Sequence, residues 1–545
     1  MSQFEKPAVP LPVRQNAWTW PGLGRWNLYF LIKLALLWGG YLNLQVLPNL
    51  VFAAVLLIPL RQRHLATLRT LIAIPVGVAL LYQDTWLPPF SRLLDQPGVL
   101  NFTPEYLLEL AGRFIDWNLC GALMLIVVAY FFIHQWLRLT TFTLAAFAWL
   151  SVGSLSTLHV PVQSLAQSAT PVQATTAGEP DSKTLEAYLQ KFYDTEAARH
   201  VEFKPADATA QPFDLLLINI CSLAWDDLET IGLRDNALLA QMDVVFDNFN
   251  SATAYSGPAA IRLLRASCGQ TSHSKLYAVA PEQCLLMDDL RKLGFENEVM
   301  LNHTGQFEGF IDEVRAQGSL PAPAVSTADL QRTLVAFDGS PIWRDRDVLD
   351  KWWEHRESQD SARVALFYNS TTLHDGNRAL TADGGTRSAD YKPRAQTLLE
   401  DLNVFLKELE KSGRRVAVVI VPEHGAALHG DRMQIPGMRE IPSPSITHVP
   451  VGIKLVGMGK NPRSGPVHVT QPSSYLALSE IIARLYASPA PPDGQGPDWQ
   501  TLLANLPETP AVSENAGTVV VDYAGKPYVR IKEKGTWLPY PQRFQ

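Results

Sequence analysis

The chain has 545 residues, more than one ordinary domain holds, and its longest apolar runs lie in the first 158 positions. Residues 1–160 carry ten Lys and Arg against six Asp and Glu, a net charge of +4, so the whole-chain charge of −7 leaves −11 on the remainder. This acidic part argues against nucleic acid as a partner, because phosphate backbones are bound by clustered Lys and Arg.

The first part of the chain has the pattern of a membrane anchor. The first 26 residues are polar and Pro-rich, and no short apolar core with an Ala-x-Ala cleavage site follows, which argues against a removed signal peptide. Five apolar segments come next: Trp26–Val46, Leu47–Leu60, Leu68–Tyr82, Trp117–Trp136 and Thr141–Leu158. The first and fourth are long enough to cross a hydrocarbon core of about 30 Å. We predict about five transmembrane helices over residues 1–158; because the second segment is short, the alternative is one long hydrophobic hairpin made with the first.

Basic residues in the short loops predict the orientation of this anchor. They precede the first segment or lie between the second and third and between the fourth and fifth: Arg14, Arg25, Arg61, Arg63, Arg69 and Arg138. All are cytoplasmic if the N-terminus is inside, and the loop at 85–115, which contains Trp86 and Tyr106, then suits an interfacial amphipathic segment outside. We therefore expect a multi-pass protein of a bacterial inner membrane whose residues after about 158 are periplasmic.

The remainder reads as a linker and an α/β domain. Residues 159–183 are rich in Ser, Thr, Ala, Gln and Pro and predict a linker. From 184 to 545, buried-strand patterns alternate with helical ones such as Pro258–Arg265 and Arg394–Lys411, which predicts an α/β sandwich with a mostly parallel sheet. The strands are expected at Phe213–Ile220, Asp243–Asn248, Val364–Tyr368, Val416–Val421 and Val451–Val456. After a Pro-rich stretch at 488–510, alternation within Thr518–Tyr540 predicts a terminal hairpin.

The four cysteines fall into three groups. Cys120 lies in a membrane segment and is expected to be a small apolar filler. Cys268 and Cys284 are sixteen residues apart and are expected to form a disulfide in an oxidising compartment, the alternative being two free buried thiols. Cys221 is then unpaired, and an unpaired cysteine outside the cytoplasm needs an explanation.

Reactive side chains follow three of the expected strands. Cys221 comes directly after Phe213–Ile220, His374 closely follows Val364–Tyr368, and the pair Glu423-His424 closely follows Val416–Val421. Open α/β sheets bind ligands at the carboxyl ends of their strands. Thiolate, imidazole and carboxylate are ligands of Zn²⁺, so these residues predict a metal site. The alternatives are a buried small residue at position 221 and a surface turn with an incidental Glu-His pair.

Ser256 precedes an expected helix, in the run Tyr255-Ser256-Gly257-Pro258. Because proline is favoured in the first turn of a helix, Ser256 should lie at or near the N-cap. The plain interpretation is a capping serine. A helix N-terminus also stabilises an alkoxide and binds phosphate, which would suit a nucleophile.

In this order and at these spacings, the residues resemble the phosphoethanolamine transferases of the alkaline phosphatase superfamily, which also have five membrane spans before a periplasmic catalytic domain. The chain departs from that family's pattern at three positions: Cys221 stands in place of a carboxylate, Ser256 in place of a threonine nucleophile, and Glu423 in place of the Asp of Asp-His-Gly. With these residues the chain is similar to the branch of the family that acts on bacterial cellulose. Three segments carry the same similarity: Asn219–Asp226, Tyr255–Gly269 and Pro422–Gln434. The resemblance covers essentially the whole chain and implies an alkaline-phosphatase-like sandwich.

The resemblance implies that four residues bind one catalytic Zn²⁺: Cys221, Ser256, Glu423 and His424. Zn²⁺ lowers the pKa of a bound hydroxyl, so Ser256 would attack the phosphorus of phosphatidylethanolamine and release diacylglycerol. The resulting phosphoethanolamine-serine would pass its group to a glucose hydroxyl of nascent cellulose, with C6 expected. A membrane anchor suits a lipid donor because it raises the effective donor concentration. The inner membrane and a cellulose synthase complex are the further partners implied.

Other residues receive supporting roles under this interpretation. His374 would bind phosphoryl oxygens or assist proton transfer, and Tyr255 would contact donor or acceptor. Arg439 would neutralise phosphate, the alternative being a solvated loop arginine. His429 and His448 are further candidates that the sequence does not rank.

Three rival functions remain at the sequence level: transfer to lipid A or another envelope glycan, hydrolysis with water as acceptor, and a non-catalytic scaffold of an export complex. The departures at Cys221 and Glu423 argue against lipid A. The intact set of candidate ligands argues against a scaffold.

Overall fold

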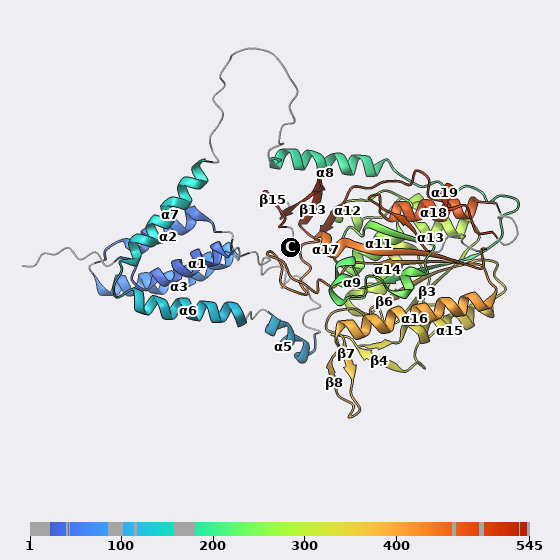
Figure 1. Cartoon of the computed structure of the whole chain (residues 1–545), viewed down its shortest axis with the longest axis horizontal. Coiled ribbons are helices and arrows are strands. Elements are labelled where there is room, and N and C mark those ends of the chain that lie inside the picture. The colour runs from blue at the N-terminus through green and yellow to red at the C-terminus, as the bar shows by residue number, and fades with distance from the viewer. Residues whose placement is uncertain are drawn as a thin grey trace, which may run out of the picture. The chain divides into compact units, whose positions relative to one another are not determined.

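The structure is a computed structural model that describes residues 22–39, 42, 44–60, 62–85, 102–113, 117–156, 180–459, 465–489, 495–532 and 535–541. The chain divides into two compact units, one of residues 1–87 and 115–172 and one of residues 88–114 and 173–545 (Figure 1). Helix α5 (Pro104–Arg113), which lies between two predicted membrane spans in sequence, therefore belongs to the unit that contains the α/β sandwich.

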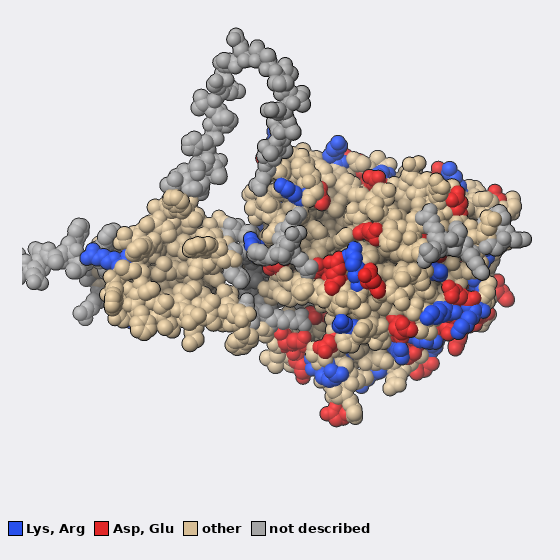
Figure 2. All heavy atoms as spheres, in the orientation of Figure 1, with Lys and Arg blue, Asp and Glu red and all other residues tan. Residues whose placement is uncertain are grey.

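The first unit consists of apolar helices. They are α1 (Trp26–Trp38), α2 (Val46–Leu57), α3 (Arg63–Asp84), α6 (Trp117–Ile133) and α7 (Leu139–Ser156). They expose large apolar side chains such as Ile72, Phe132 and Trp149, and Figure 2 shows few charged side chains on the visible face of this unit. Such a surface suits contact with lipid.

The predicted spans and the observed helices differ in their limits. The segment Trp26–Val46 is not one helix, because α1 ends at Trp38 where two glycines follow, a poor sequence for continuing a helix. Among the described residues, one helix, His64–Asp84, is both long and apolar enough to cross a membrane. Five membrane spans remain a prediction.

A buried ion pair joins three of these helices. Lys33 of α1 pairs with Asp84 of α3, and both side chains are fully buried. Asn49 of α2 accepts a 2.7 Å hydrogen bond from Lys33 Nζ and donates one of 2.9 Å to Asp84. Because an unpaired charge is costly in an apolar interior, this network explains how Lys33 is accommodated within an apolar segment.

The second unit is built on a seven-stranded sheet of order β11-β2-β10-β9-β1-β6-β3. β1 pairs in parallel with β6 and β9, β3 with β6, and β11 with β2, whereas β10 is antiparallel to its neighbours β9 and β2, which confirms the mostly parallel sheet. The two edge strands, β3 and β11, were not predicted, because one begins with polar residues and the other has only three residues. The strands are β1 (Asp214–Ile220), β2 (Val244–Asn250), β3 (Glu296–Leu301), β6 (Val364–Ser370), β9 (Val416–Pro422), β10 (His448–Val456) and β11 (Val467–Val469).

Helices cover both faces of this sheet and bury it. On β1, Leu215 and Leu217 belong to one core and Leu216 and Ile218 to the other, as the period of two in a strand requires. One face packs on α11 (Ser256–Leu264), α13 (Leu286–Lys292), α14 (Phe310–Gly318) and α18 (Tyr475–Ala487). The other packs on α9 (Trp225–Ile231), α10 (Ala237–Ala240), α15 (Asp345–Glu357) and α16 (Tyr391–Ser412). The helices predicted at Pro258–Arg265 and Arg394–Lys411 are confirmed as α11 and α16.

Two smaller sheets complete this unit. The predicted terminal hairpin is present as β13 and β14 within a four-stranded sheet, on which α8 (Ser182–Ala197) packs through Leu185 and Phe192. The helix therefore begins inside the predicted linker, whose residues 159–179 lie outside the described residues. The terminal sheet consists of β12 (Val512–Asn515), β13 (Thr518–Tyr523), β14 (Lys526–Ile531) and β15 (Trp537–Pro539). The other small sheet consists of β5 (Pro341–Trp343), β4 (Arg332–Val335), β7 (Arg378–Leu380) and β8 (Thr386–Ser388).

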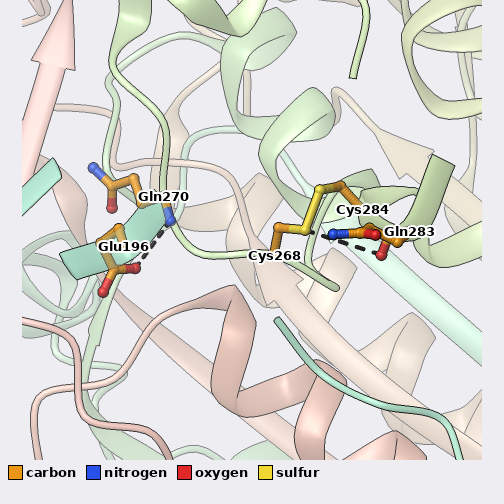
Figure 3. Close-up of a disulfide and its surroundings, with 5 residues drawn as sticks. All are labelled: Glu196, Cys268, Gln270, Gln283 and Cys284. Carbon is orange, nitrogen blue, oxygen red and sulfur yellow. Dashed lines mark hydrogen bonds between the residues drawn. A yellow bond between two sulfur atoms is a disulfide. The ribbon is translucent and has the colours of Figure 1, made fainter. Parts of the chain in front are cut away.

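Cys268 and Cys284 form a disulfide that closes the loop between α11 and α13 (Figure 3). In a chain-entropy account, a loop of this length stabilises the folded state by about 3 kcal/mol. We expect the double variant Cys268→Ala, Cys284→Ala of the full chain to lose about that much free energy of unfolding, measured by denaturant titration, while its metal content is unchanged. Cys120→Ala is the control, and a thiol count that finds four free thiols in the unreduced wild type would contradict the assignment.

Candidate metal centre

Strand register brings the candidate ligands together. Ile220 of β1 lies opposite Pro422 of β9, so the residues that follow, Cys221 and Glu423, leave the sheet side by side. Cys221 Sγ lies 3.8 Å from His424 Nε2. One ligand atom from each of Cys221, Glu423 and His424 lies within 4.8 Å of the other two, and all three side chains are buried. A thiol, a carboxylate and an imidazole thus converge at the carboxyl edge of the sheet.

Ser256 is the fourth member of this cluster. Its Oγ lies 3.3 Å from Cys221 Sγ and 3.3 Å from His424 Nε2. Ser256 is the first residue of α11, and the N-cap is Tyr255, whose side chain makes no capping hydrogen bond. The serine is therefore not the capping residue of the helix, and its hydroxyl points instead at the candidate metal ligands.

The hydrogen bonds of His424 fix which nitrogen faces the cluster. Nδ1 donates to the Gly425 carbonyl at 2.9 Å, which leaves the lone pair of Nε2 directed toward Cys221 and Ser256. Arg439 Nη1 lies 3.3 Å from Nδ1 but, being a donor itself, hydrogen-bonds to Ser222 Oγ at 3.0 Å. The imidazole is therefore oriented as a metal ligand.

The electrostatics of the cluster favour a cation. Burial, and then the nearby Glu423 carboxylate, raise the pKa of Cys221 to about 12. Burial also raises the pKa of Glu423, while burial and then the charge of Arg439 lower that of His424. Glu423 Oε2 has no hydrogen-bond partner within the described part of the chain. A divalent cation would satisfy that oxygen and stabilise the thiolate, and a donor set of S, O and N fits Zn²⁺.

Comparison with known proteins identifies the family of this chain. The family models "Cellulose biosynthesis protein BcsG N-terminal domain" and "Cellulose biosynthesis protein BcsG C-terminal domain" match residues 26–152 and 169–537. The cellulose biosynthesis protein BcsG of Escherichia coli (strain K12) is 46% identical, covering 99% of this chain and 100% of the relative. The chain belongs to the BcsG family. The Salmonella typhimurium (strain LT2) protein of the same name is also 46% identical, over 99% of each chain.

Solved structures with partial similarity are more distant. They include a Vibrio parahaemolyticus protein in the alkaline phosphatase superfamily, 12% identical with a TM-score of 0.45 over 65% of this chain and 91% of that one. The C-terminal periplasmic domain of EcEptC from Escherichia coli, in complex with Zn, is 12% identical with a TM-score of 0.40 over 62% and 95%. Membership of the BcsG family rests on the family models and the sequence relatives.

In this BcsG-family chain, Asn369 positions the Glu423 carboxylate and was not predicted from the sequence. Its Nδ2 donates to Glu423 Oε1 at 2.6 Å and to Asn219 Oδ1 at 3.0 Å. Asn219 and Asn369 lie opposite each other on β1 and β6. Both are polar residues near the ends of apolar strands, which is only a weak sequence signal for a positioning role.

Replacing Asn369 by leucine should weaken metal binding, because Glu423 Oε1 would lose its donor and the carboxylate its orientation. We expect a 10- to 100-fold loss of zinc affinity, as is usual when a residue that orients a ligand is removed. The measurement is zinc competition with a chromophoric chelator on the full chain. Asn403→Leu, a buried asparagine on α16 that pairs with Gln241, is the matched control. Equal affinity of Asn369→Leu and wild type would contradict this role.

Three further residues shape the loops that carry the site. Asp227 accepts hydrogen bonds from the backbone N–H of Ala224 and of Ala426, at 2.9 and 2.8 Å, so it ties the start of α9 to the loop after His424. Gly425 is required beside it, because a Cβ there would lie 2.7 Å from the Ala224 Cβ. Asn515 of β12 accepts from Ala254 N and donates to the Arg439 and Glu440 carbonyls.

His374 follows β6 as predicted, and its pKa is affected by burial and by the charge of Arg439, which lies beside His424. Burial, and then the charge of Arg439, lower its pKa to about 4, so the imidazole is neutral at pH 7. Its ring stacks on Phe337 with a centroid distance of 4.6 Å. Nδ1 lies 2.6 Å from the Asp375 carbonyl, to which it donates when neutral. Helix α5 covers this loop, because Tyr106 donates to Asp375 Oδ2 at 3.1 Å and packs on Phe337.

The structure places the remaining candidate residues at different distances from the ligand cluster. Arg439 contacts Ser222 and lies beside His424, so it belongs to the site. The Tyr255 hydroxyl donates to Glu440 Oε1 at 2.8 Å. His448 Nε2 lies 2.6 Å from the Asp247 carbonyl, on the β10–β2 pair, and His429 is exposed. Neither His429 nor His448 is among the residues grouped as candidate metal ligands in the described part of the chain.

Proposed function

We propose that this chain is a zinc-dependent phosphoethanolamine transferase that moves phosphoethanolamine from phosphatidylethanolamine to glucose hydroxyls of nascent cellulose, with C6 expected. The observation that carries the proposal is Ser256, whose Oγ lies 3.3 Å from both a thiol and an imidazole at the first residue of a helix. Membership of a family of cellulose biosynthesis proteins supports cellulose as the acceptor.

In this proposal Cys221, Glu423 and His424 would hold one zinc ion, and Ser256 would be the hydroxyl that the ion activates. The ion would lower the pKa of the serine hydroxyl. Ser256 Oγ then attacks phosphorus, a phosphoethanolamine-serine forms, and the P–O bond to diacylglycerol breaks with a proton passing to the departing oxygen. The amino-terminal end of α11 carries partial positive charge that suits the phosphoryl oxygens.

We assign His374 a role in the second half of the reaction. It is neutral, and with Nδ1 donating to the Asp375 carbonyl its Nε2 carries the lone pair. This nitrogen would take the proton of the glucose hydroxyl as that oxygen attacks phosphorus and the bond to Ser256 Oγ breaks. Arg439 would neutralise phosphoryl charge, and Tyr255 would contact donor or sugar.

The test is a transfer assay with competing acceptors. The zinc-loaded full chain in a bilayer containing phosphatidylethanolamine receives cello-oligosaccharides, lipid A or neither, and products are identified by mass spectrometry. We expect oligosaccharides that gain phosphoethanolamine. Modification of lipid A alone would overturn the acceptor, release of free phosphoethanolamine alone would indicate a hydrolase, and complete inactivity would indicate a scaffold.

The proposed reaction requires the second unit to face the periplasm, as the loop charges predict, with the chain multi-pass in the inner membrane beside a cellulose synthase complex. A reporter fused after residue 545 tests this directly. A periplasmic phosphatase fused there should be active and a cytoplasmic fluorescent protein dark, and the reverse pattern would exclude the topology.

A further inference from the structure

His303 lies two residues beyond the end of β3, at the same edge of the sheet as the candidate metal ligands. β3 pairs in parallel with β6, and its last residue, Leu301, lies opposite Asn369. Because parallel strands bring their carboxyl ends to one edge, β3 delivers an imidazole to this edge, as β6 does with His374. His303 was not predicted from the sequence, because β3 itself was not predicted, and the proposed reaction does not use it.

The hydrogen bonds of His303 define which of its ring nitrogens carries the proton. The side chain is partly buried, and burial lowers its pKa to about 4, so the imidazole is neutral at pH 7 and has one N–H group. Nδ1 accepts a 3.1 Å hydrogen bond from the backbone N–H of Gly305 and therefore carries the lone pair. The proton is then on Nε2, which donates to Asn369 Oδ1 at 2.9 Å.

The contacts of Asn369 continue this series of hydrogen bonds toward the metal centre. Its amide oxygen accepts from His303, so its amide nitrogen is free to donate to Asn219 Oδ1 and to Glu423 Oε1. Asn219 in turn donates from Nδ2 to the Val421 carbonyl of β9. The residues lie on, or just after, the adjacent strands β3, β6, β1 and β9, so the series crosses the sheet at its carboxyl edge.

Burial and direction distinguish this series from a chance contact. Asn369 and Asn219 are 1% and 0% exposed, so a lost partner of either amide leaves a buried polar atom unsatisfied, which is costly. The donors of His303 and Asn369 both point toward Glu423, and hydrogen bonds aligned in one direction strengthen one another in a protein interior. A polarised N–H at the end of the series suits a charged carboxylate, which is the form that binds a cation.

We propose that His303 is a positioning residue of the metal centre, which holds Asn369 and, through it, the Glu423 carboxylate in the orientation that binds the metal. The inference rests on the proposed zinc site and adds a residue that lies outside the set of ligands. When His303 loses its Nε2 donor, the Asn369 amide loses one of the contacts that hold it toward Glu423. The consequence is weaker metal binding in a chain that is still folded.

The test compares two amide substitutions of His303 in the full chain, by zinc competition with a chromophoric chelator. The side-chain nitrogen in His303→Gln takes the place of Nε2 and keeps a donor for Asn369, so zinc affinity should stay within about twofold of wild type. The shorter amide in His303→Asn reaches only the place of Nδ1, so it keeps the contact with Gly305 and loses Asn369. We expect His303→Asn to lose about three- to tenfold in zinc affinity, less than a direct partner of a ligand.

Two further variants make the comparison specific. His355→Asn makes the same change at a histidine of α15 that contacts Gln359, and it should bind zinc like wild type. In the Asn369→Leu background the series is already broken, so His303→Asn should cause no further loss, whereas local unfolding would add to it.

Three results would each overturn the inference: undiminished affinity in His303→Asn, an equal loss in His303→Gln, and additive losses in the double variant. Absence of zinc binding by the wild type would overturn the metal centre of the proposed function, and this inference with it.

Discussion

Alanine in place of Ser256 is expected to lower phosphoethanolamine transfer by roughly a thousandfold or more, the scale of effect seen when a nucleophile is removed from an active site. Three zinc ligands remain in this variant, so most of the metal should stay bound. The fold should also survive, because Ser256 is the first helical residue of α11 and not its N-cap, and its hydroxyl points at Cys221 and His424.

Ser182→Ala is the matched control for this experiment. Ser182 is the first residue of α8, as Ser256 is of α11, but it packs in the terminal sheet region away from the metal ligands. Transfer, zinc content and thermal stability would be measured on all three proteins. Transfer by Ser256→Ala within tenfold of the wild-type rate would exclude the serine as nucleophile, even if cellulose is the acceptor.

Removal of a metal ligand should have a different signature. We expect Cys221→Ser and His424→Ala to lose both zinc and transfer, because each leaves only two of three protein ligands and a buried, unsatisfied neighbour. Zinc per chain, determined by elemental analysis after dialysis, is the measurement. Cys120→Ser, at the other free cysteine, and His448→Ala, bonded to the Asp247 carbonyl, are the controls. Unchanged zinc content in both ligand variants would mean that the metal lies elsewhere.

The convergence of the candidate ligands could be expected from the sequence, because parallel strands bring their carboxyl ends to one edge of the sheet. The apolar runs that became β1, β6 and β9 are each followed within a few residues by a reactive side chain, and adjacent parallel pairing brings Cys221 beside Glu423. The position of Ser256 followed from the proline two residues later. What the sequence left open was whether the hydroxyl caps the helix, since that depends on backbone angles at Tyr255.

The residues that the sequence did not predict act across long separations. Asn515 holds the loops of Ala254 and Arg439 from a small terminal sheet, and Asp227 holds the loop after His424. Helix α5 is the clearest case, because it lies between predicted membrane spans in sequence. Its Tyr106 contacts Asp375, the neighbour of His374, across a sequence separation of 269 residues. Such contacts leave no local periodicity, and therefore only tertiary structure reveals them.

The central claim, that Ser256 forms a covalent intermediate, can be tested by intact mass spectrometry. The zinc-loaded full chain is incubated with a phosphatidylethanolamine analogue in the absence of any glucan, then digested to locate the modified residue. We predict a mass increase of one phosphoethanolamine group on Ser256 in wild type and no such increase in Ser256→Ala. If neither protein forms the adduct while Ser256→Ala still turns the analogue over, the acceptor attacks the lipid directly and the covalent mechanism is wrong.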